Sequence, residues 1–175
     1  KLNTFCITSI TTLGNGTSSF SAQNLGAGRE DRVRAGLRAS VRLALILSVP
    51  FFAAFFFAGK QMLSLFMNEG STVAMETGLN FLRIVSPFYF IISVKLMADG
   101  VLRGAGAMGA FMAATFTDLV LRVVLAFLFS AFLGAAGIWL SWPVGWITAA
   151  VLSVIFYQKG GWRNRAVTAE EAHEL

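Results

Sequence analysis

The chain has 175 residues, of which 56% are hydrophobic and only 13% are charged, and its mean hydropathy is +0.69. Because soluble domains carry about 25% charged residues, this composition indicates an integral membrane protein. The net charge of +5 does not point to a nucleic-acid partner, since the basic residues flank apolar runs and are not interleaved with aromatic residues.

Enzymatic chemistry has no support in the sequence. The single cysteine, Cys6, and the single histidine, His173, exclude an intrachain disulfide and a His/Cys metal cluster. No serine has a plausible histidine partner in the apolar part of the chain. We therefore expect no enzyme activity, no metal site and no cofactor. The chain enters apolar sequence directly after Lys1, without the basic leader of a signal peptide, so we expect it to begin partway through a larger protein.

Residues 2–25 form the least hydrophobic of five predicted membrane spans. Thr, Ser, Asn and Gln recur along this segment, and Gly14 and Gly16 would allow close packing or a local break. In lipid these polar groups need partners, so most of the helix should face other helices or a water-filled cavity. The pattern leaves both alternatives open.

The segment 26–38 is predicted to be the only long polar connector between spans. Its Gly-Ala-Gly could be mistaken for a phosphate-binding loop, but no strand precedes it, so a helix end and a basic juxtamembrane segment are the better interpretation. The second span, 39–59, contains Pro50 and then a cluster of phenylalanines. This cluster suits a lipid-facing or packing surface, with a drug-binding aromatic cluster as the alternative. Residues 60–71 are predicted to be a short loop.

The third span, 78–102, is predicted to organise the bundle. Pro87 lies inside it and removes a backbone hydrogen bond, so we expect a bend or hinge there. Lys95, Asp99 and Arg103 follow at intervals of four, which places alternating charges on one helical face, where each can reach the next. A polar stripe of this kind must face protein or water.

The last two spans are 109–133 and 137–158. The first of them holds Asp118 and Arg122, which are four residues apart and can pair directly. A structural ion pair is the simpler interpretation of these residues, and a role in transport is the alternative. The final span follows a tight turn. Trp139, Trp142 and Trp146 lie near one end of this span and Tyr157 lies at the other, as expected of the aromatic belts at the two membrane interfaces.

The distribution of basic residues predicts the orientation of the spans. If the tail 166–175 is cytoplasmic, the inner segments carry eight Lys and Arg residues and the outer segments carry two. This bias places the first residue outside and the C-terminus in the cytoplasm. The inner residues are Arg29, Arg32, Arg34, Arg38, Arg103, Lys159, Arg163 and Arg165, and the outer ones are Lys1 and Lys60.

Three stretches together resemble the multidrug and toxic compound extrusion (MATE) family. The first is the run AQNLGAG at 22–28, with arginines directly behind it. The second consists of LRI at 82–84, SP at 86–87 and LRGAG at 102–106. The third consists of Arg122, GAAG at 134–137 and WPVGW at 142–146. Their order and spacing cover nearly the whole chain, which makes the combination specific.

In that family, two six-helix lobes surround a central cavity and alternate access to its two sides. The resemblance implies that residues 1–165 are the second to sixth helices of the C-terminal lobe, an all-α polytopic bundle whose partner is the N-terminal lobe of the same polypeptide. It implies export of cationic or amphipathic drugs across the cell membrane, driven by protons or sodium. A flippase for lipid-linked precursors, of related fold, is the alternative function, and a non-transporting membrane assembly module is a third.

The resemblance also suggests where coupling residues lie in the family. Sodium-dependent members have a carboxylate about three turns before Leu-Arg-Gly, where this chain has Ile92, and proton-driven members have the key acid in the N-terminal lobe. Small cationic substrates and membrane lipids are the other expected partners. We expect the substrate cavity to be lined by Asn15, Ser18, Gln23, Tyr89 and Ser93. Our candidates for ion coupling or gating are Lys95, Asp99, Asp118 and Arg122, with Pro87 as the hinge.

Overall fold

The computed structural model describes residues 1–66 and 72–163, so the predicted tail and part of the predicted loop 60–71 lie outside the described residues. Within these two ranges the chain is helical and contains no strand, which confirms the predicted all-α fold. The elements are α1 (Leu2–Gly26), α2 (Glu30–Phe57), α3 (Gly59–Ser64), α4 (Thr72–Val85), the 3₁₀ turn η1 (Ser86–Phe88), α5 (Tyr89–Gly104), α6 (Met108–Leu133) and α7 (Ala135–Gln158).

Four helical segments of the described chain are long and apolar enough to cross a membrane. They are α2, the run from α4 to α5, α6 and α7, and they correspond to four of the five predicted spans. The fifth, α1, is a continuous helix of 25 residues with no break at Gly14 or Gly16. Its many hydroxyl and amide side chains keep its hydropathy below that of the other four, so its crossing of the membrane stays a prediction.

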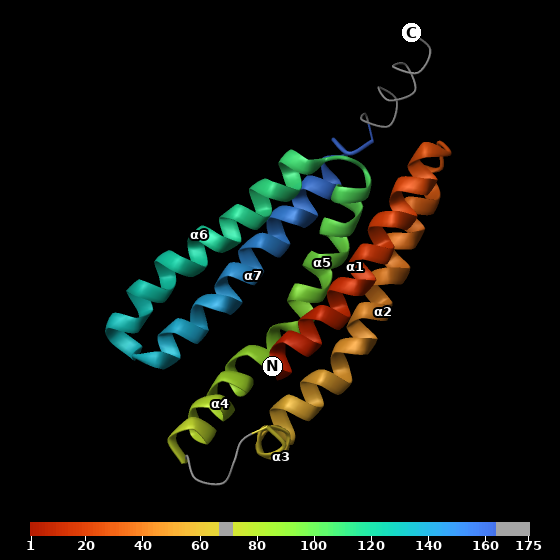
Figure 1. Cartoon of the computed structure of the whole chain (residues 1–175). Coiled ribbons are helices and arrows are strands. Elements are labelled where there is room, and N and C mark those ends of the chain that lie inside the picture. The colour runs from red at the N-terminus through yellow and green to blue at the C-terminus, as the bar shows by residue number, and fades with distance from the viewer. Residues whose placement is uncertain (67–71, 164–175) are drawn as a thin grey trace.

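Helix α5 is the centre of the bundle. Figure 1 shows it between the α1–α2 hairpin and the α6–α7 hairpin, and it packs against α1, α2 and α7. Ten of its 16 residues are buried. The prediction that this segment organises the bundle is therefore confirmed.

Two Gly-Ala-Gly stretches end α1 and α5 in the same way. Gly28 and Gly106 have φ values of +68° and +67°, which residues with a side chain rarely adopt. Beyond them, the Arg29 N–H donates to Asn24 O at 2.7 Å, and the Ala107 N–H donates to Leu102 O at 2.8 Å. These bonds satisfy the last carbonyls of each helix, so both stretches are helix ends, as predicted for the first of them.

The prediction of a long polar connector at 26–38 is wrong, because α2 already begins at Glu30. Acidic residues are favourable at a helix N-terminus, and Glu30 pairs with Arg34 one turn later, at 3.5 Å. Hydropathy predicts only the part of a helix that lies in the apolar layer of the membrane. The charged residues at the start of α2 are helical too, but they lie outside that layer, so hydropathy does not reveal them.

Helices α1 and α5 pack backbone against backbone. A Cβ atom on Gly100 would lie 2.5 Å from Gly14 O, and one on Gly14 would lie 2.9 Å from Leu96 O. A Cβ on Gly104 would overlap with Ser18 O. Gly14 therefore serves close packing rather than a helix break.

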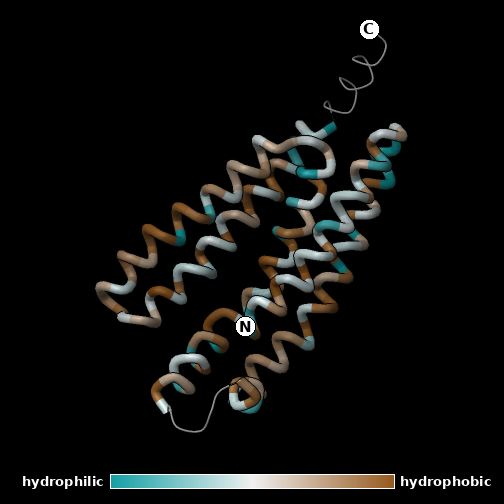
Figure 2. The backbone as a smooth tube through the Cα atoms, in the orientation of Figure 1, coloured by the Kyte–Doolittle hydropathy of each residue, from teal (hydrophilic) through white to brown (hydrophobic). Residues whose placement is uncertain are grey.

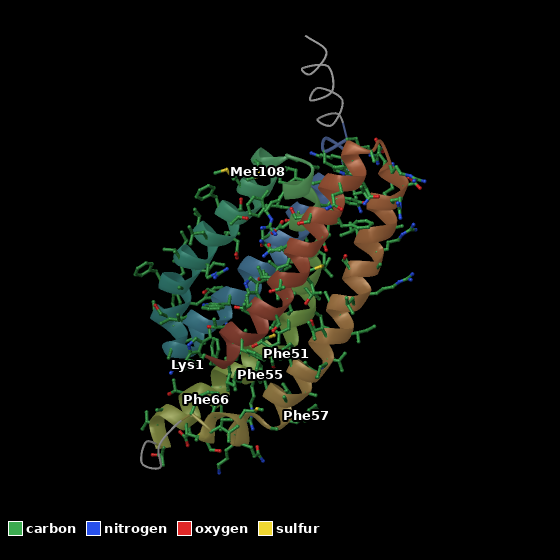
Figure 3. All side chains as sticks on the ribbon, turned by 45° about the vertical axis from the view of Figure 1, so that its right-hand side comes forward. Lys1, Phe51, Phe55, Phe57, Phe66 and Met108 are labelled. Carbon is green, nitrogen blue, oxygen red and sulfur yellow. The ribbon has the colours of Figure 1, made fainter. Side chains whose placement is uncertain are left out.

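The outward faces of α6 and of the part of α2 after Arg42 are largely apolar. Figure 2 shows hydrophobic residues along α6 and hydrophilic ones gathered at the α1–α2 turn. Phe57 and Met108 project away from the bundle in Figure 3 and are 75% and 47% exposed. Trp146, in contrast, was predicted to lie in an interfacial belt but is buried against Tyr89, with ring centroids 6.4 Å apart, so that prediction is wrong for this residue.

Candidate functional site

Lys95 and Asp99 form a buried ion pair on α5. Lys95 Nζ donates to Asp99 Oδ2 at 2.6 Å, and the two residues are 5% and 2% exposed. Ser153 of α7 donates its hydroxyl to the other oxygen, Asp99 Oδ1, at 2.6 Å. Both oxygens of this carboxylate therefore have donors, which a charge inside a bundle requires.

Arg103, the third residue of the predicted stripe, does not extend this pair. Its Nη2 donates to Asn15 Oδ1 of α1 at 3.1 Å, and its guanidinium lies 5.5 Å from the ring centroid of Phe111 on α6. The predicted contact between Lys95 and Asp99 is thus confirmed, and the predicted contact between Asp99 and Arg103 is wrong. Neighbouring helices supply the partners of Arg103, and spacing along α5 alone cannot show them.

On α6, Asp118 pairs directly with Arg122, as their spacing predicts. Asp118 is 8% exposed, and the Arg122 guanidinium lies 5.0 Å from the ring centroid of Trp142 on α7. The pair uses Arg122 Nη2 and Asp118 Oδ2. In the part of the chain that the structure describes, Asp118 Oδ1 and Arg122 Nε are buried without a hydrogen-bond partner. The pair therefore lacks the second bond that an arginine and a carboxylate can form.

The four candidate coupling residues form one cluster between α5, α6 and α7. A Cβ atom at Gly145 of α7 would overlap with Asp118 Oδ1, so the carboxylate points at the backbone of α7. Asp118 also interacts electrostatically with Lys95 and Asp99 across the helix interface. We call Lys95, Asp99, Asp118 and Arg122 the charge cluster. With two acids and two bases, the charge cluster is neutral overall when all four groups are ionised.

Helix α1 presents a polar face that no described helix covers. Its exposed polar residues recur at intervals of three or four and are Thr4, Thr8, Thr12, Asn15, Ser19 and Gln23. The candidates Asn15 and Gln23 belong to this face, whereas Ser18 is half-buried beside Gly104 of α5.

The candidates Tyr89 and Ser93 lie in the interior of the described chain. The Tyr89 hydroxyl donates to Asn3 Oδ1 at 2.9 Å, and Ser93 Oγ is 2.7 Å from Ser48 Oγ of α2. Both residues are fully buried. The structure therefore does not bring them onto the face that holds Asn15 and Gln23, and their assignment to a cavity stays a prediction.

The helix is interrupted at Pro87, where we expected a bend. Pro87 occupies the 3₁₀ turn η1, between the α-helical segments α4 and α5. Next to it, the Ser86 hydroxyl is fully buried and has no hydrogen-bond partner among the described residues. A hinge motion at this interruption stays a prediction.

Residues of α7 that touch the charge cluster were missed by sequence reasoning. Ser153 donates to Asp99, Gly145 faces Asp118, and Trp142 lies under Arg122. Gly145, Ala149 and Ser153 follow at intervals of four and are all buried. Small residues at this spacing mark a face that packs closely against another helix, which is the signal that could have found Gly145 and Ser153.

An apolar cavity of about 620 Å³ lies between α1, α2 and α3. Its volume falls in the range of small-molecule pockets. Figure 3 labels four of the residues that line it, namely Lys1, Phe51, Phe55 and Phe66. The phenylalanine cluster of the second span thus has a cavity beside it, and drug binding there stays a prediction.

Taken together, an apolar helix bundle with a largely buried charge cluster and an uncovered polar helix face defines a polytopic membrane protein. A family model described as MatE matches residues 1–128. The chain therefore belongs to the MatE family, as the sequence motifs predicted.

Three curated proteins are similar to this chain. The probable multidrug resistance protein YpnP of Bacillus subtilis (strain 168) is 30% identical over 159 residues, which cover 90% of this chain and 35% of YpnP. The probable multidrug resistance protein YoeA of the same strain is 26% identical over 162 residues, covering 89% of this chain and 34% of YoeA. The probable multidrug resistance protein NorM of Thermotoga maritima is 26% identical over 154 residues, with coverages of 86% and 33%.

The chain thus spans about a third of the length of these relatives. No solved structure matches it significantly.

Proposed function

We propose that this chain is part of a secondary active antiporter that exports cationic or amphipathic compounds across the cell membrane in exchange for protons or sodium. It supplies the second to sixth helices of the C-terminal lobe, with its C-terminus in the cytoplasm and the N-terminal lobe of the same polypeptide as its partner. Membership of the MatE family and the relatives' names as probable multidrug resistance proteins support drug export. Those names do not point to a flippase.

The main structural support for this proposal is the polar face of α1. The other side of the helix packs closely against α5 through Gly14, while hydroxyl and amide groups line the exposed side over its whole length. The Thr12 hydroxyl donates to Thr8 O and Asn15 Oδ1 accepts from Arg103, but lipid offers no partner to the other lone pairs and amide hydrogens of this face, so its exposure to lipid would be costly. A water-filled path between two lobes would hydrate them, and their oxygens would accept hydrogen bonds from a cationic substrate.

The test is efflux of ethidium by the full-length protein in a bacterial strain that lacks its own drug pumps. We expect cells that contain the protein to accumulate less ethidium than cells that do not, and a protonophore combined with a sodium ionophore to abolish the difference. Asn15→Leu and Gln23→Leu should reduce efflux. Phe127→Leu is the matched control, because Phe127 is 76% exposed on the apolar face of α6. Equal efflux by all three variants would contradict a substrate path along α1.

A further inference from the structure

Asp118 Oδ1 is the one oxygen of the charge cluster's two carboxylates that has no hydrogen-bond partner among the described residues. Both oxygens of Asp99 are occupied, by Lys95 and by Ser153. Asp118 Oδ2 pairs with Arg122, whereas Oδ1 is buried, accepts nothing and faces Gly145. A buried polar atom without a partner requires an explanation, and a bound proton or ion is one.

We propose that Asp118 Oδ1 is the atom that binds the coupling ion in this lobe and that this ion is a proton. This inference rests on the proposed antiport and adds to it the identity of the ion and the residue that carries it.

The surroundings of Asp118 favour a proton over sodium. Hard metal cations take several oxygen ligands at once. Here one oxygen is free, Gly145 offers no side chain, and Arg122 and Lys95 would repel a second cation. A proton needs only the single oxygen.

The charged groups around Asp118 show what its protonation would change. Arg122 faces it from its own helix, Lys95 and Asp99 face it from α5, and α7, between Ala135 and Gln158, contains no acidic or basic residue. A proton taken from water onto Oδ1 neutralises Asp118, so the charge cluster passes from neutral to one positive charge in excess. One O–H bond of the hydronium ion that donates the proton breaks as the new O–H bond of Asp118 forms, and a water molecule is released.

An excess positive charge inside a bundle is unfavourable, and Arg122 is the group that can leave. Its side chain is 28% exposed, against 6% for Lys95, which stays bound to Asp99. Moving Arg122 changes its contact with Trp142 and hence the packing between α6 and α7. The proton-bound and proton-free states thus differ at the interface between α6 and α7. Such a difference is needed for a bound ion to favour one of two conformations.

Two measurements on the purified full-length transporter test this inference. The first is the infrared difference spectrum between acidic and neutral pH, in which a carboxyl that takes up a proton gives a new carbonyl band. We expect a band that is lost in Asp118→Asn and kept in Asp99→Asn. This readout does not depend on transport. Because a carboxyl of the N-terminal lobe can add a band of its own, the whole spectra are compared: a difference spectrum of Asp118→Asn identical to that of the natural protein would overturn the assignment to Asp118.

The second measurement is ethidium transport in proteoliposomes under an imposed pH gradient or an imposed sodium gradient. We expect the pH gradient alone to drive uphill transport by the natural protein. Asp118→Asn should lose uphill transport but still equilibrate ethidium down its own gradient. If Asp118→Asn does not fold, Asp118→Asn with Arg122→Gln removes both charges and should give the same result.

The outcomes separate the two proposals. Uphill transport driven by sodium and not by the pH gradient would overturn the proton as the coupling ion and leave the antiporter intact. Undiminished pH-driven transport in Asp118→Asn would overturn Asp118 as the residue that carries the proton, and it would also leave the antiporter intact. A natural protein that moves no ethidium under either gradient would contradict the proposed function, while the infrared band would still report whether Asp118 binds a proton.

Discussion

Gly100→Ala should destabilise the bundle, because it places a methyl group between two backbones. The new Cβ would lie 2.5 Å from Gly14 O and 3.2 Å from Thr17 Cβ. Ordinary contacts of a Cβ atom are 3.4–4 Å, so α1 and α5 must move apart. Overpacking costs about 1–3 kcal/mol, and a clash with backbone should lie at the upper end of that range. The better helix propensity of alanine offsets about 1 kcal/mol, which leaves a net loss of about 2 kcal/mol.

Gly16→Ala is the matched control for this experiment. It makes the same chemical change on the adjoining helix, but no atom lies within 4 Å of its new Cβ. We expect it to leave stability unchanged or to raise it by up to about 1 kcal/mol. The assay is unfolding of the full-length protein by sodium dodecyl sulfate in mixed micelles, followed by circular dichroism. If Gly100→Ala unfolds at the same detergent fraction as Gly16→Ala, the close packing of α1 on α5 is wrong.

Four further predictions follow from the same structure. Ser153→Ala removes a donor from buried Asp99 and should cost about 1–3 kcal/mol, whereas Ser141→Ala, whose hydroxyl bonds only Ile138 O of its own helix, should cost less in the same unfolding assay. Lys95→Met or Asp99→Asn alone should destabilise by about 3–5 kcal/mol, and the double variant by less than the sum; additive losses would show that the two residues do not interact. Pro87→Ala should slow ethidium efflux while binding is retained, and normal efflux would argue against a hinge. Cysteines placed at the exposed residues Thr72 and Lys159 should react with impermeant reagents from opposite sides of the membrane, with Thr72 outside; labelling from one side would refute the orientation.

Much of the fold could be predicted from the sequence, because hydropathy and helical spacing are local properties. The apolar runs located the helices that became α2, α5, α6 and α7, and Pro87 marked the interruption before α5. The same local character explains the errors. The charged first turns of α2 are helical although they are not apolar, and Trp146 is buried although tryptophan is typical of interfaces.

The candidate site could be predicted only where both partners lie on one helix. The spacing of four residues revealed the pairs of Lys95 with Asp99 and of Asp118 with Arg122. It could not show that the two pairs lie close enough to interact electrostatically, because the rotation of α6 relative to α5 depends on packing against α7. The contribution of Ser153 depends on the same packing.

The most direct test of the proposed function is the dependence of ethidium transport on ion gradients in proteoliposomes that contain the full-length protein. When the pH and the sodium concentration are equal inside and outside the vesicles, ethidium should only equilibrate across the membrane. When a pH gradient is imposed, we expect ethidium to accumulate above equilibrium on the acidic side, because each proton that enters through Asp118 exchanges for substrate. Equilibration without accumulation under both pH and sodium gradients would contradict an ion-coupled exporter.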